Sequence, residues 1–309
     1  MDLFRLEGKK LAPVARVTPK AERDIQHLLE ANLDTVFRVT FLASEYSTGE
    51  KHSGRIDTLG IDENQTPVII EYKLSSSVNV ITQALYYLDW LVDHKAEFEQ
   101  LTRKRLKGDQ EVDWTAPRVL CVADAFAPYD TYAVSQMGRA IQLIEYKLYA
   151  GGLLTVDVVG DANAGGETKP SYSVEAHLSH AKGPARTWAE ELREYLLGLG
   201  DDVSEAPAKQ YIAYRTTRNI CCLEVQKEQI VLYLALDPAL GEGCSICQDV
   251  TTIGHYGTGN LRVRVSGAGD VDTAKHFIEL AYEQVSGSGI ALRSGLVALL
   301  RSLVRAPCS

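Results

Sequence analysis

Long hydrophobic runs are missing from this chain of 309 residues. No apolar stretch approaches the ~20 residues that a membrane-spanning helix requires. The first segment, MDLFRLEGKKLAPVARVTPK, also lacks the uninterrupted apolar core of a secretory signal peptide. From these two absences we expect a cytoplasmic protein that has no membrane partner.

An excess of positive charge is also missing, since 41 acidic residues outnumber 32 basic ones and give a formal net charge of −9. This balance argues against a protein that coats nucleic acid, whose affinity comes mainly from neutralising phosphates. An enzyme with a local basic groove remains compatible with it. The densest cationic stretch is RKRLK at 103–107.

Cysteine is scarce, with six residues in the whole chain. Without a secretion signal, this number does not indicate a disulfide framework. Cys244 and Cys247 form a single CxxC in GEGCSICQD, but a structural zinc site needs two further ligands. The adjacent Cys221 and Cys222 are poorly spaced to supply them, so we expect loop and core cysteines.

The first 163 residues alternate between helical and strand patterns. TPKAERDIQHLLEANLDTVF places apolar residues at helical spacing behind Thr18, the expected N-cap, and Pro19. The following runs predict strands, a long helix with at most one break, and then strand, helix and strand. The expected ranges are helix 18–37, strands 38–46, 54–61 and 67–74, helix 78–106, strand 117–126, helix 135–150 and strand 152–161. This order predicts an α/β domain with a mixed sheet.

The rest of the chain divides at a Gly/Ala/Pro-rich stretch. Residues 164–207 are interpreted as a linker followed by a bridging helix near 187–198. Residues 208–286 carry several strand patterns and a closing helix capped by Asp270 or Asp272, which predicts a small α+β domain. Residues 287–309 form a tail, either a docking helix or a disordered segment.

The hairpin GRIDTLGIDENQTPVIIEYKL carries charges where a buried strand should end. Glu71 and Lys73 share one face of the second strand, about 7 Å apart at ~3.3 Å per residue. A partner strand that places Asp57 opposite would bring two carboxylates and one ammonium together. Isolated ionised groups are costly there, and two close carboxylates repel unless a cation lies between them.

A divalent cation such as Mg²⁺ resolves this conflict, because it prefers carboxylate oxygens and keeps several waters. Asp57, Glu71 and the main-chain carbonyl of Tyr72 are the expected ligands. Lys73 would then orient or activate the attacking water in phosphodiester hydrolysis. The alternative is a structural Glu71–Lys73 ion pair with Asp57 exposed in a turn.

The set of motifs in GRIDTLGIDENQTPVIIEYK and QALYYLDWL resembles the PD-(D/E)XK nuclease superfamily. Within it, the chain is most similar to small bacterial and archaeal DNA nucleases that write the first motif as GRID. Ile56 stands where the superfamily's name has proline, a departure common in this branch. Gln83 and Tyr87 match the Q-x-x-x-Y signature of RecB-like members. The resemblance covers residues 18–160.

This resemblance implies a restriction-endonuclease-like mixed sheet flanked by helices, followed by a small C-terminal α+β domain. It implies that Gln83 points into the active site, and that one more acid comes from the first helix. Glu22 matches that acid best, with Glu30 as the alternative. The second unit is similar to small uncharacterised domains that follow such nuclease domains.

Nucleic-acid contacts are expected from side chains around this site. The cations at the end of the long helix would bind phosphates, or else compensate the helix dipole. In the second unit, GHYGTGN is either a substrate-reading loop or a tight turn with a satisfied His255. Four arginines there form either a phosphate-binding surface or a solvated strand face. The expected nucleic-acid-binding residues of the first unit are Arg55, Tyr87, Arg103, Lys104, Arg105 and Lys107; the four arginines are Arg215, Arg218, Arg262 and Arg264.

Two hypotheses follow for the whole chain. The first is a Mg²⁺- or Mn²⁺-dependent deoxyribonuclease of DNA repair, restriction or phage defence. Its C-terminal domain would serve substrate recognition, homodimer formation or contact with a protein partner. The second is a catalytically silent nucleic-acid-binding or assembly protein that keeps the nuclease fold. Metal-dependent cleavage separates the two.

Overall fold

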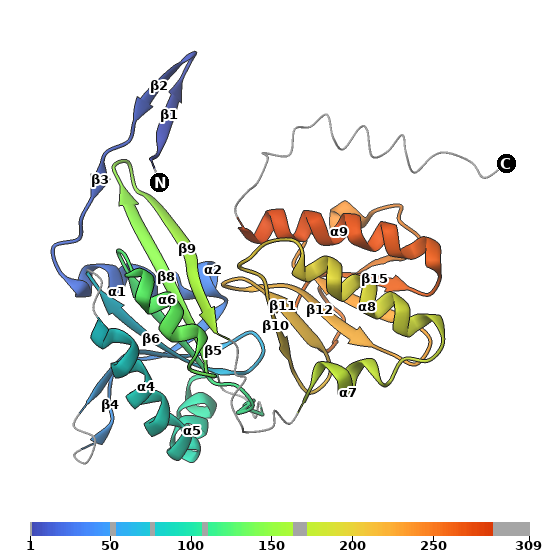
Figure 1. Cartoon of the computed structure of the whole chain (residues 1–309), viewed down its shortest axis with the longest axis horizontal. Coiled ribbons are helices and arrows are strands. Elements are labelled where there is room, and N and C mark those ends of the chain that lie inside the picture. Colours follow the sequence, from blue (N-terminus) through green and yellow to red (C-terminus); the bar gives the residue numbers. More distant parts are fainter. Residues whose placement is uncertain (1, 50–53, 75–77, 107–110, 163–171, 287–309) are drawn as a thin grey trace. The chain divides into compact units, whose positions relative to one another are not determined.

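The computed structural model describes residues 2–49, 54–74, 78–106, 111–162 and 172–286 (Figure 1). The chain divides into two compact units, Met1–Lys169 and Pro170–Ser309. Each unit has its own sheet and its own hydrophobic core. Among the helices of the described ranges, none is long and apolar enough to cross a membrane.

A seven-stranded mixed sheet forms the centre of the N-terminal unit, in the order β3-β8-β7-β6-β5-β4 with β9 paired to β8. β6, β7 and β8 run parallel, and the other neighbours are antiparallel. A separate two-stranded sheet of β1 and β2 precedes it (Figure 1). The strands are β1 (Phe4–Glu7), β2 (Lys10–Pro13), β3 (Arg16–Val17), β4 (Val39–Ser47), β5 (Arg55–Asp62), β6 (Pro67–Lys73), β7 (Arg118–Ala123), β8 (Ala140–Tyr149) and β9 (Leu153–Ala162).

Helices cover both faces of this sheet. Side chains of α1 and α2 join one core, and side chains of α4, α5 and α6 join the other. The helices are α1 (Glu22–Glu30), α2 (Leu33–Phe37), α4 (Val78–Asp93), α5 (Lys95–Leu106) and α6 (Pro128–Ser135). A mixed sheet flanked by helices is the α/β architecture that the sequence predicts, so the fold class is confirmed.

β6 is buried on both faces because it lies in the middle of the sheet. Val68, Ile70 and Tyr72 face the α1–α2 core, whereas Ile69 faces the α4–α5 core. This alternation is the two-residue period of a strand. The β5–β6 hairpin is antiparallel, as predicted.

The helix predicted at 135–150 is wrong, because Ala140–Tyr149 is the strand β8. Its apolar residues serve both cores, with Leu143 on one face and Ile144 on the other. The register with β9 shifts at this point, but the extra residue is Val159 of β9, so β8 keeps its alternation between the two cores. A strand buried on both faces therefore gave an apolar spacing that resembles a helix.

The first predicted helix also differs from the structure. The segment 18–37 forms two helices, and α1 begins at Glu22 with Ala21, not Thr18, at its N-cap. The Asp24 carboxylate accepts the backbone N–H of Ala21 at 3.0 Å and takes over the capping role. The long helix 78–106 is confirmed with one break, at His94, where α4 ends and α5 begins. The helix α6 was not predicted.

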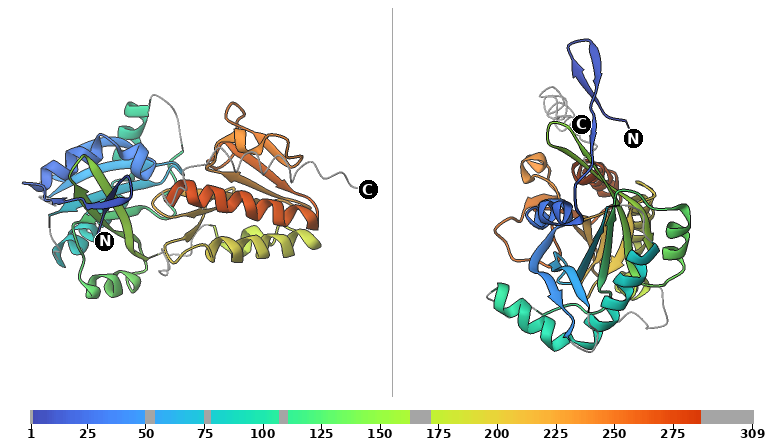
Figure 2. Two further views of the ribbon diagram at one scale, coloured as in Figure 1. Left: turned by 90° about the horizontal axis from the view of Figure 1, so that it is seen from above. Right: turned by 90° about the vertical axis from the view of Figure 1, so that its left-hand side faces the viewer.

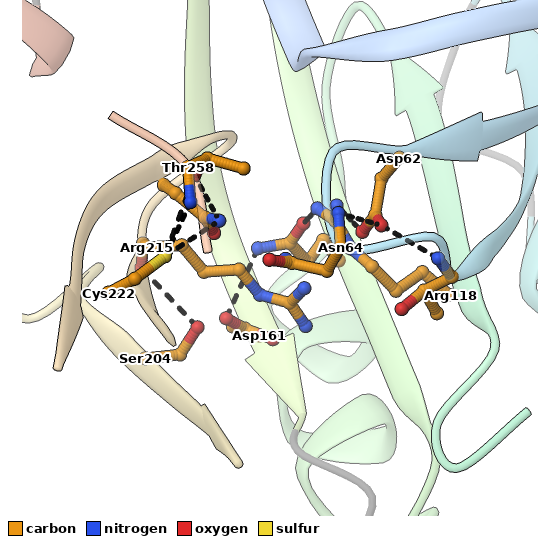
Figure 3. A network of polar contacts seen from close by, with 11 residues as sticks. Asp62, Asn64, Arg118, Asp161, Ser204, Arg215, Cys222 and Thr258 are labelled. Carbon is orange, nitrogen blue, oxygen red and sulfur yellow. Dashed lines mark hydrogen bonds and ion pairs between the residues drawn. The ribbon is translucent and has the colours of Figure 1, made fainter. Parts of the chain in front are cut away.

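A buried polar network fixes the strands of this unit (Figure 3). The Asp62 carboxylate accepts the backbone N–H of Asn64 at 2.9 Å and the Arg118 guanidinium at 2.9 Å. Arg118 also donates to Gln142, at 2.7 Å, and Gln142 donates to Asp161 at 3.2 Å. This chain of contacts ties the end of β5 to β7, β8 and β9.

The C-terminal unit is built on a six-stranded antiparallel sheet in the order β10-β11-β12-β13-β15-β14. α8 and α9 lie side by side over one face and enclose its main core (Figure 2). The elements are α7 (Val174–Leu178), α8 (Pro184–Leu197), β10 (Ser204–Pro207), β11 (Ile212–Arg215), β12 (Asn219–Val225), β13 (Ile230–Leu234), η1 (Pro238–Gly241), β14 (Cys247–Asp249), β15 (Leu261–Val265) and α9 (Ala268–Ser286). The interval 164–207, interpreted as linker and bridging helix, thus includes α7, α8 and β10. The predicted 287–309 tail lies outside the described residues.

The GHYGTGN segment of this unit is a bent loop between β14 and β15. The two ring nitrogens of His255 lie 2.7 and 3.1 Å from the carbonyl oxygens of Ile253 and Gly259, and the protonated nitrogen donates to its carbonyl. Its ring stacks on Tyr233, with 4.6 Å between centroids. Gly259 has a φ of 123°, which favours glycine. The His255 ring is therefore held within the fold, as the second interpretation expects, although the segment is a bent loop and not a tight turn.

Candidate active site

The candidate site begins where β5 and β6 separate. The ladder between them ends at the Thr58–Ile70 pair, so Asp57 and Glu71 lie one step beyond it. There the Asp57 carboxylate accepts the backbone N–H of Tyr72 at 3.0 Å, and the Glu71 carboxylate accepts the backbone N–H of Asp57 at 3.2 Å. The two side chains take the place of backbone acceptors, which brings both carboxylates to the same point.

Glu71 is fully buried, with 0% of its surface exposed. Burial, followed by the nearby charge of Asp57, raises the pKa of Glu71 to about 9. Burial also raises the pKa of Asp57, although the hydrogen bond from Tyr72 opposes this shift. The pair therefore resists carrying two negative charges unless further positive charge is supplied.

Lys73 lies at the end of β6, and its ammonium contacts Glu22 of α1 at 3.1 Å. Its charge lowers the pKa of both Asp57 and Glu71. Glu30, the alternative acid, is engaged elsewhere, because it accepts the hydroxyl of Thr58 at 2.6 Å. Of the two acids of the first helix, Glu22 is the one that contacts Lys73.

α4 covers the other side of the carboxylate pair. Gln83 donates to Glu71 at 2.9 Å, which orients the carboxylate. Tyr87, one turn later, accepts the backbone N–H of Arg55 at 3.1 Å. A Cβ at Gly54 would lie 2.5 Å from the Tyr87 ring, so the glycine of GRID leaves the space that this ring occupies.

Tyr72 contributes through its main chain. The N–H and C=O groups of one strand residue point to the same side, so its carbonyl lies on the Asp57 side of β6. Its side chain points into the α1–α2 core, where the hydroxyl accepts from Thr58 at 3.3 Å. The carbonyl and the two carboxylates thus belong to one cluster of oxygens.

The sequence reasoning missed two residues of this cluster. Gln26, a buried polar residue on the apolar face of α1, donates to the Asp57 carbonyl at 3.0 Å. Glu45 lies on β4, where the neighbouring residue pairs of β4 and β5 place it across from Asp57. Its backbone φ is 51°. It forms an ion pair with Arg55 at 2.8 Å. A polar residue on an apolar helix face could have identified Gln26, whereas nothing local marks Glu45.

The expected cations lie apart from this cluster. Arg103, Lys104 and Arg105 are exposed on the last turn of α5, and Arg103 pairs with Glu99 at 3.6 Å. In the described ranges no hydrogen bond or ion pair joins them to Asp57 or Glu71. Lys107 lies outside the described residues. Arg55 is the predicted nucleic-acid contact that lies beside the carboxylates.

The four arginines of the second unit do not form one surface in the structure. Arg262 and Arg264 lie on the same face of β15. Arg215 is buried, with 6% of its surface exposed, and Arg218 donates to the Gln284 carbonyl at 3.2 Å. Over the described ranges, no group of three His, Cys, Asp or Glu side chains is close enough to hold a metal ion unaided.

Comparison of the sequence with known families and proteins gives two matches. Residues 174–285 match a family described as "Domain of unknown function (DUF5655)". An uncharacterised protein of Haemophilus influenzae is 26% identical over 287 residues, which cover 86% of this chain and 94% of that protein. The family match begins at α7 and ends in α9, so it covers the C-terminal unit.

Two solved structures are similar to part of the chain. A repair endonuclease from Pyrococcus abyssi is 16% identical over 42% of this chain, with a TM-score of 0.30. A complex of EndoMS with double-stranded DNA is 15% identical over 46% of this chain, with a TM-score of 0.28. The matches span 50% and 49% of those two chains, about half their length.

Proposed function

We propose that the N-terminal unit is a metal-dependent nuclease that hydrolyses phosphodiester bonds of DNA. The observation that carries this proposal is the reciprocal contact of Asp57 and Glu71 at the separation of β5 and β6. Lys73 and Gln83 converge on the same pair from either side. All of these residues belong to the motifs that resemble PD-(D/E)XK nucleases.

The donor set fits a hard divalent cation. Two carboxylates and a main-chain carbonyl are the oxygen ligands that Mg²⁺ and Mn²⁺ prefer. Glu71 is buried, and its raised pKa indicates that the surrounding protein supplies too little positive charge to stabilise the carboxylate. Asp57, Glu71 and the Tyr72 carbonyl would hold the ion. A bound ion would polarise the phosphodiester and favour ionisation of the attacking water.

The side chains around the pair have distinct roles in this proposal. Lys73 stabilises negative charge on the phosphate and orients the attacking water, and Glu22 holds its ammonium in place. Gln83 fixes the Glu71 carboxylate. Arg55, with its backbone held by Tyr87, contacts the phosphate backbone of the substrate.

The proposal is tested by incubating the full chain with plasmid, linear duplex, branched and single-stranded DNA. Each substrate is tested with Mg²⁺, with Mn²⁺ and with EDTA. We expect cleavage with either metal and none with EDTA. The Glu71→Gln variant should lose cleavage while circular dichroism shows an unchanged fold. Asp157→Asn, which alters an exposed carboxylate on β9, is the matched control and should cleave normally.

The alternative of a silent binding protein predicts a different result. DNA binding would then be equal in Mg²⁺ and EDTA, and no substrate would be cut. Calorimetry with Mn²⁺ gives a second readout, since Asp57→Asn should weaken metal binding. Full metal affinity in that variant would remove Asp57 from the ligand set.

A further inference from the structure

The CxxC of the C-terminal unit forms a closed turn before β14. The backbone N–H of Cys247 donates to the Cys244 carbonyl at 3.2 Å, which makes Cys244–Cys247 a β-turn. The ends of such a turn lie within about 7 Å, close to the Cα separation that a disulfide spans. Gly241 has no Cβ that would crowd Cys247, since an added Cβ would lie 3.1 Å from that of Cys247.

The two thiols are free and in direct contact. The Cys247 thiol donates to the Cys244 sulfur, with 2.7 Å between the sulfur atoms. Both residues are partly exposed, whereas Cys121, Cys221 and Cys222 are fully buried. Burial, followed by the contact with Cys244, raises the pKa of the Cys247 thiol well above its usual range.

This turn forms one wall of a surface cavity of about 270 Å³. The opposite wall comes from the outer face of β15 and the start of α9. The residues that line it include Ser245, Ile246, Cys247, Arg262, Arg264 and Asp270. Cys247 is the cysteine of the pair that lines this cavity, so one of the two thiols lies beside a space that a small thiol-reactive molecule can enter.

The charge in this cavity is positive. In the described part of the chain, the Arg264 guanidinium has no acidic or hydrogen-bonding partner. Arg262 donates to Gln248, a neutral amide. The Asp270 carboxylate is already used, because it accepts the backbone N–H groups of Ser266 and Gly267, each at 2.9 Å. The cavity therefore favours ligands that carry carboxylates.

We infer that Cys244 and Cys247 form a redox-active dithiol that reacts with small anionic disulfides, the chemical class of glutathione disulfide. The thiolate of one cysteine attacks one sulfur of the ligand, so a mixed disulfide forms as the ligand's own S–S bond breaks and one half of the ligand leaves. The other cysteine then attacks the protein sulfur of the mixed disulfide and releases the second half. Two protein thiols are oxidised to one disulfide, and the ligand is reduced to two thiols that take up the two protons.

The first experiment follows the oxidation by mass spectrometry. The full chain carries Cys308→Ser throughout, and it is incubated with glutathione disulfide before the remaining thiols are alkylated. We expect a Cys244–Cys247 disulfide without a retained glutathionyl group. Cys247→Ser and Cys244→Ser should each retain a glutathionyl group on the remaining cysteine of the pair, because the second step is lost.

The second experiment tests the role of charge. Arg264→Gln should slow oxidation by glutathione disulfide about tenfold, at the low end of electrostatic steering effects. The same variant should react at the normal rate with uncharged bis(2-hydroxyethyl) disulfide. Arg186→Gln alters an arginine of α8 that does not line the cavity, so it should leave both rates unchanged.

Two results would overturn the inference. One is the absence of a Cys244–Cys247 disulfide even in excess glutathione disulfide, with the fold of the protein intact by circular dichroism. The other is equal slowing of both disulfides by Arg264→Gln, which would mean that the cavity does not select anionic ligands. Neither result depends on DNA cleavage by the N-terminal unit.

Discussion

At the scale of single residues, the candidate site depends on two side-chain carboxylates that replace main-chain carbonyls as hydrogen-bond acceptors. Asp57 and Glu71 each accept a backbone N–H that the sheet ladder no longer satisfies. This arrangement stabilises two carboxylates at one point, although burial opposes their charge. The same geometry that completes the backbone hydrogen bonding thus creates the cluster of oxygens proposed to hold a cation.

Lys73→Ala should abolish most cleavage without unfolding the chain. Its ammonium is half of an ion pair with Glu22, and the Glu22 side chain is 46% exposed, so water can solvate Glu22 when the ammonium is lost. We expect cleavage to fall about 10²–10⁴-fold, the range of a lost acid–base or charge-stabilising group. Single-turnover cleavage measures the effect. Lys20→Ala, an exposed lysine preceding α1, is the control, and equal loss in both variants would contradict the proposed role.

Gly54→Ala should destabilise the N-terminal unit through the Tyr87 ring. The new Cβ would lie 2.5 Å from that ring, and Tyr87 also accepts the Arg55 N–H. Overpacking of this kind costs about 1–3 kcal/mol of the free energy of unfolding. Urea unfolding measures the loss. Gly254→Ala is the control, since nothing lies within 4 Å of its Cβ position, and a similar loss there would contradict the explanation.

At the scale of elements, a buried ion pair holds the strands that carry the site. Asp62 ends β5, and Arg118 begins β7, with β6 between them in the sheet. Their side chains are 0% and 3% exposed, and they meet at 2.9 Å. The pair lies at the opposite end of β5 from Asp57, so it fixes the strands at one end while they separate at the other.

Removal of this pair should be costly. Asp62→Ala leaves Arg118 charged and buried, and it also removes the acceptor for the Thr66 N–H at 3.0 Å. Breaking a buried pair costs about 3–5 kcal/mol. Asp34→Ala breaks the exposed pair with Arg38 and should cost less than about 1 kcal/mol. Urea unfolding of both variants compares them, and equal costs would show that burial does not decide the effect.

At the scale of the whole molecule, the chain consists of two units with separate cores. The proposed hydrolytic site lies in the first, and the dithiol lies in the second. His177 belongs to the second unit, where its Nε2 contacts the Ala208 carbonyl at 2.8 Å. Burial lowers the pKa of His177, so the folded unit favours the neutral ring. The pH dependence that His177 causes should therefore appear in the stability of the C-terminal unit alone.

Acid should destabilise the C-terminal unit through His177. Its contribution is complete above about pH 6.5, where the unfolded histidine is neutral as well. The contribution falls as the pH drops below that value, because the unfolded chain binds the proton first. Urea unfolding followed by fluorine NMR of fluorotryptophan at Trp188 measures it. His177→Gln should flatten the decline, whereas His27→Gln, on the exposed face of α1, should not.

The sequence by itself determined the elements whose signal is local. The β5–β6 hairpin, the long helix broken at His94 and the α/β class follow from apolar periodicity. Asp57, Glu71 and Lys73 were also identified from their chemistry, whereas Glu22 and Gln83 came from the resemblance to a nuclease family. The structure places Glu22 in contact with Lys73 and Gln83 in contact with Glu71.

The tertiary structure decided whatever depends on contacts between distant segments. β8 is a strand because partners on both sides and both faces override its helix-like spacing. Glu45 lies across from Asp57, and Glu45 itself has left-handed backbone. The Cys244–Cys247 thiols gain positive neighbours because β15 returns beside their turn. The periodicity of apolar residues reflects the environment of one segment, whereas these features depend on contacts between two segments.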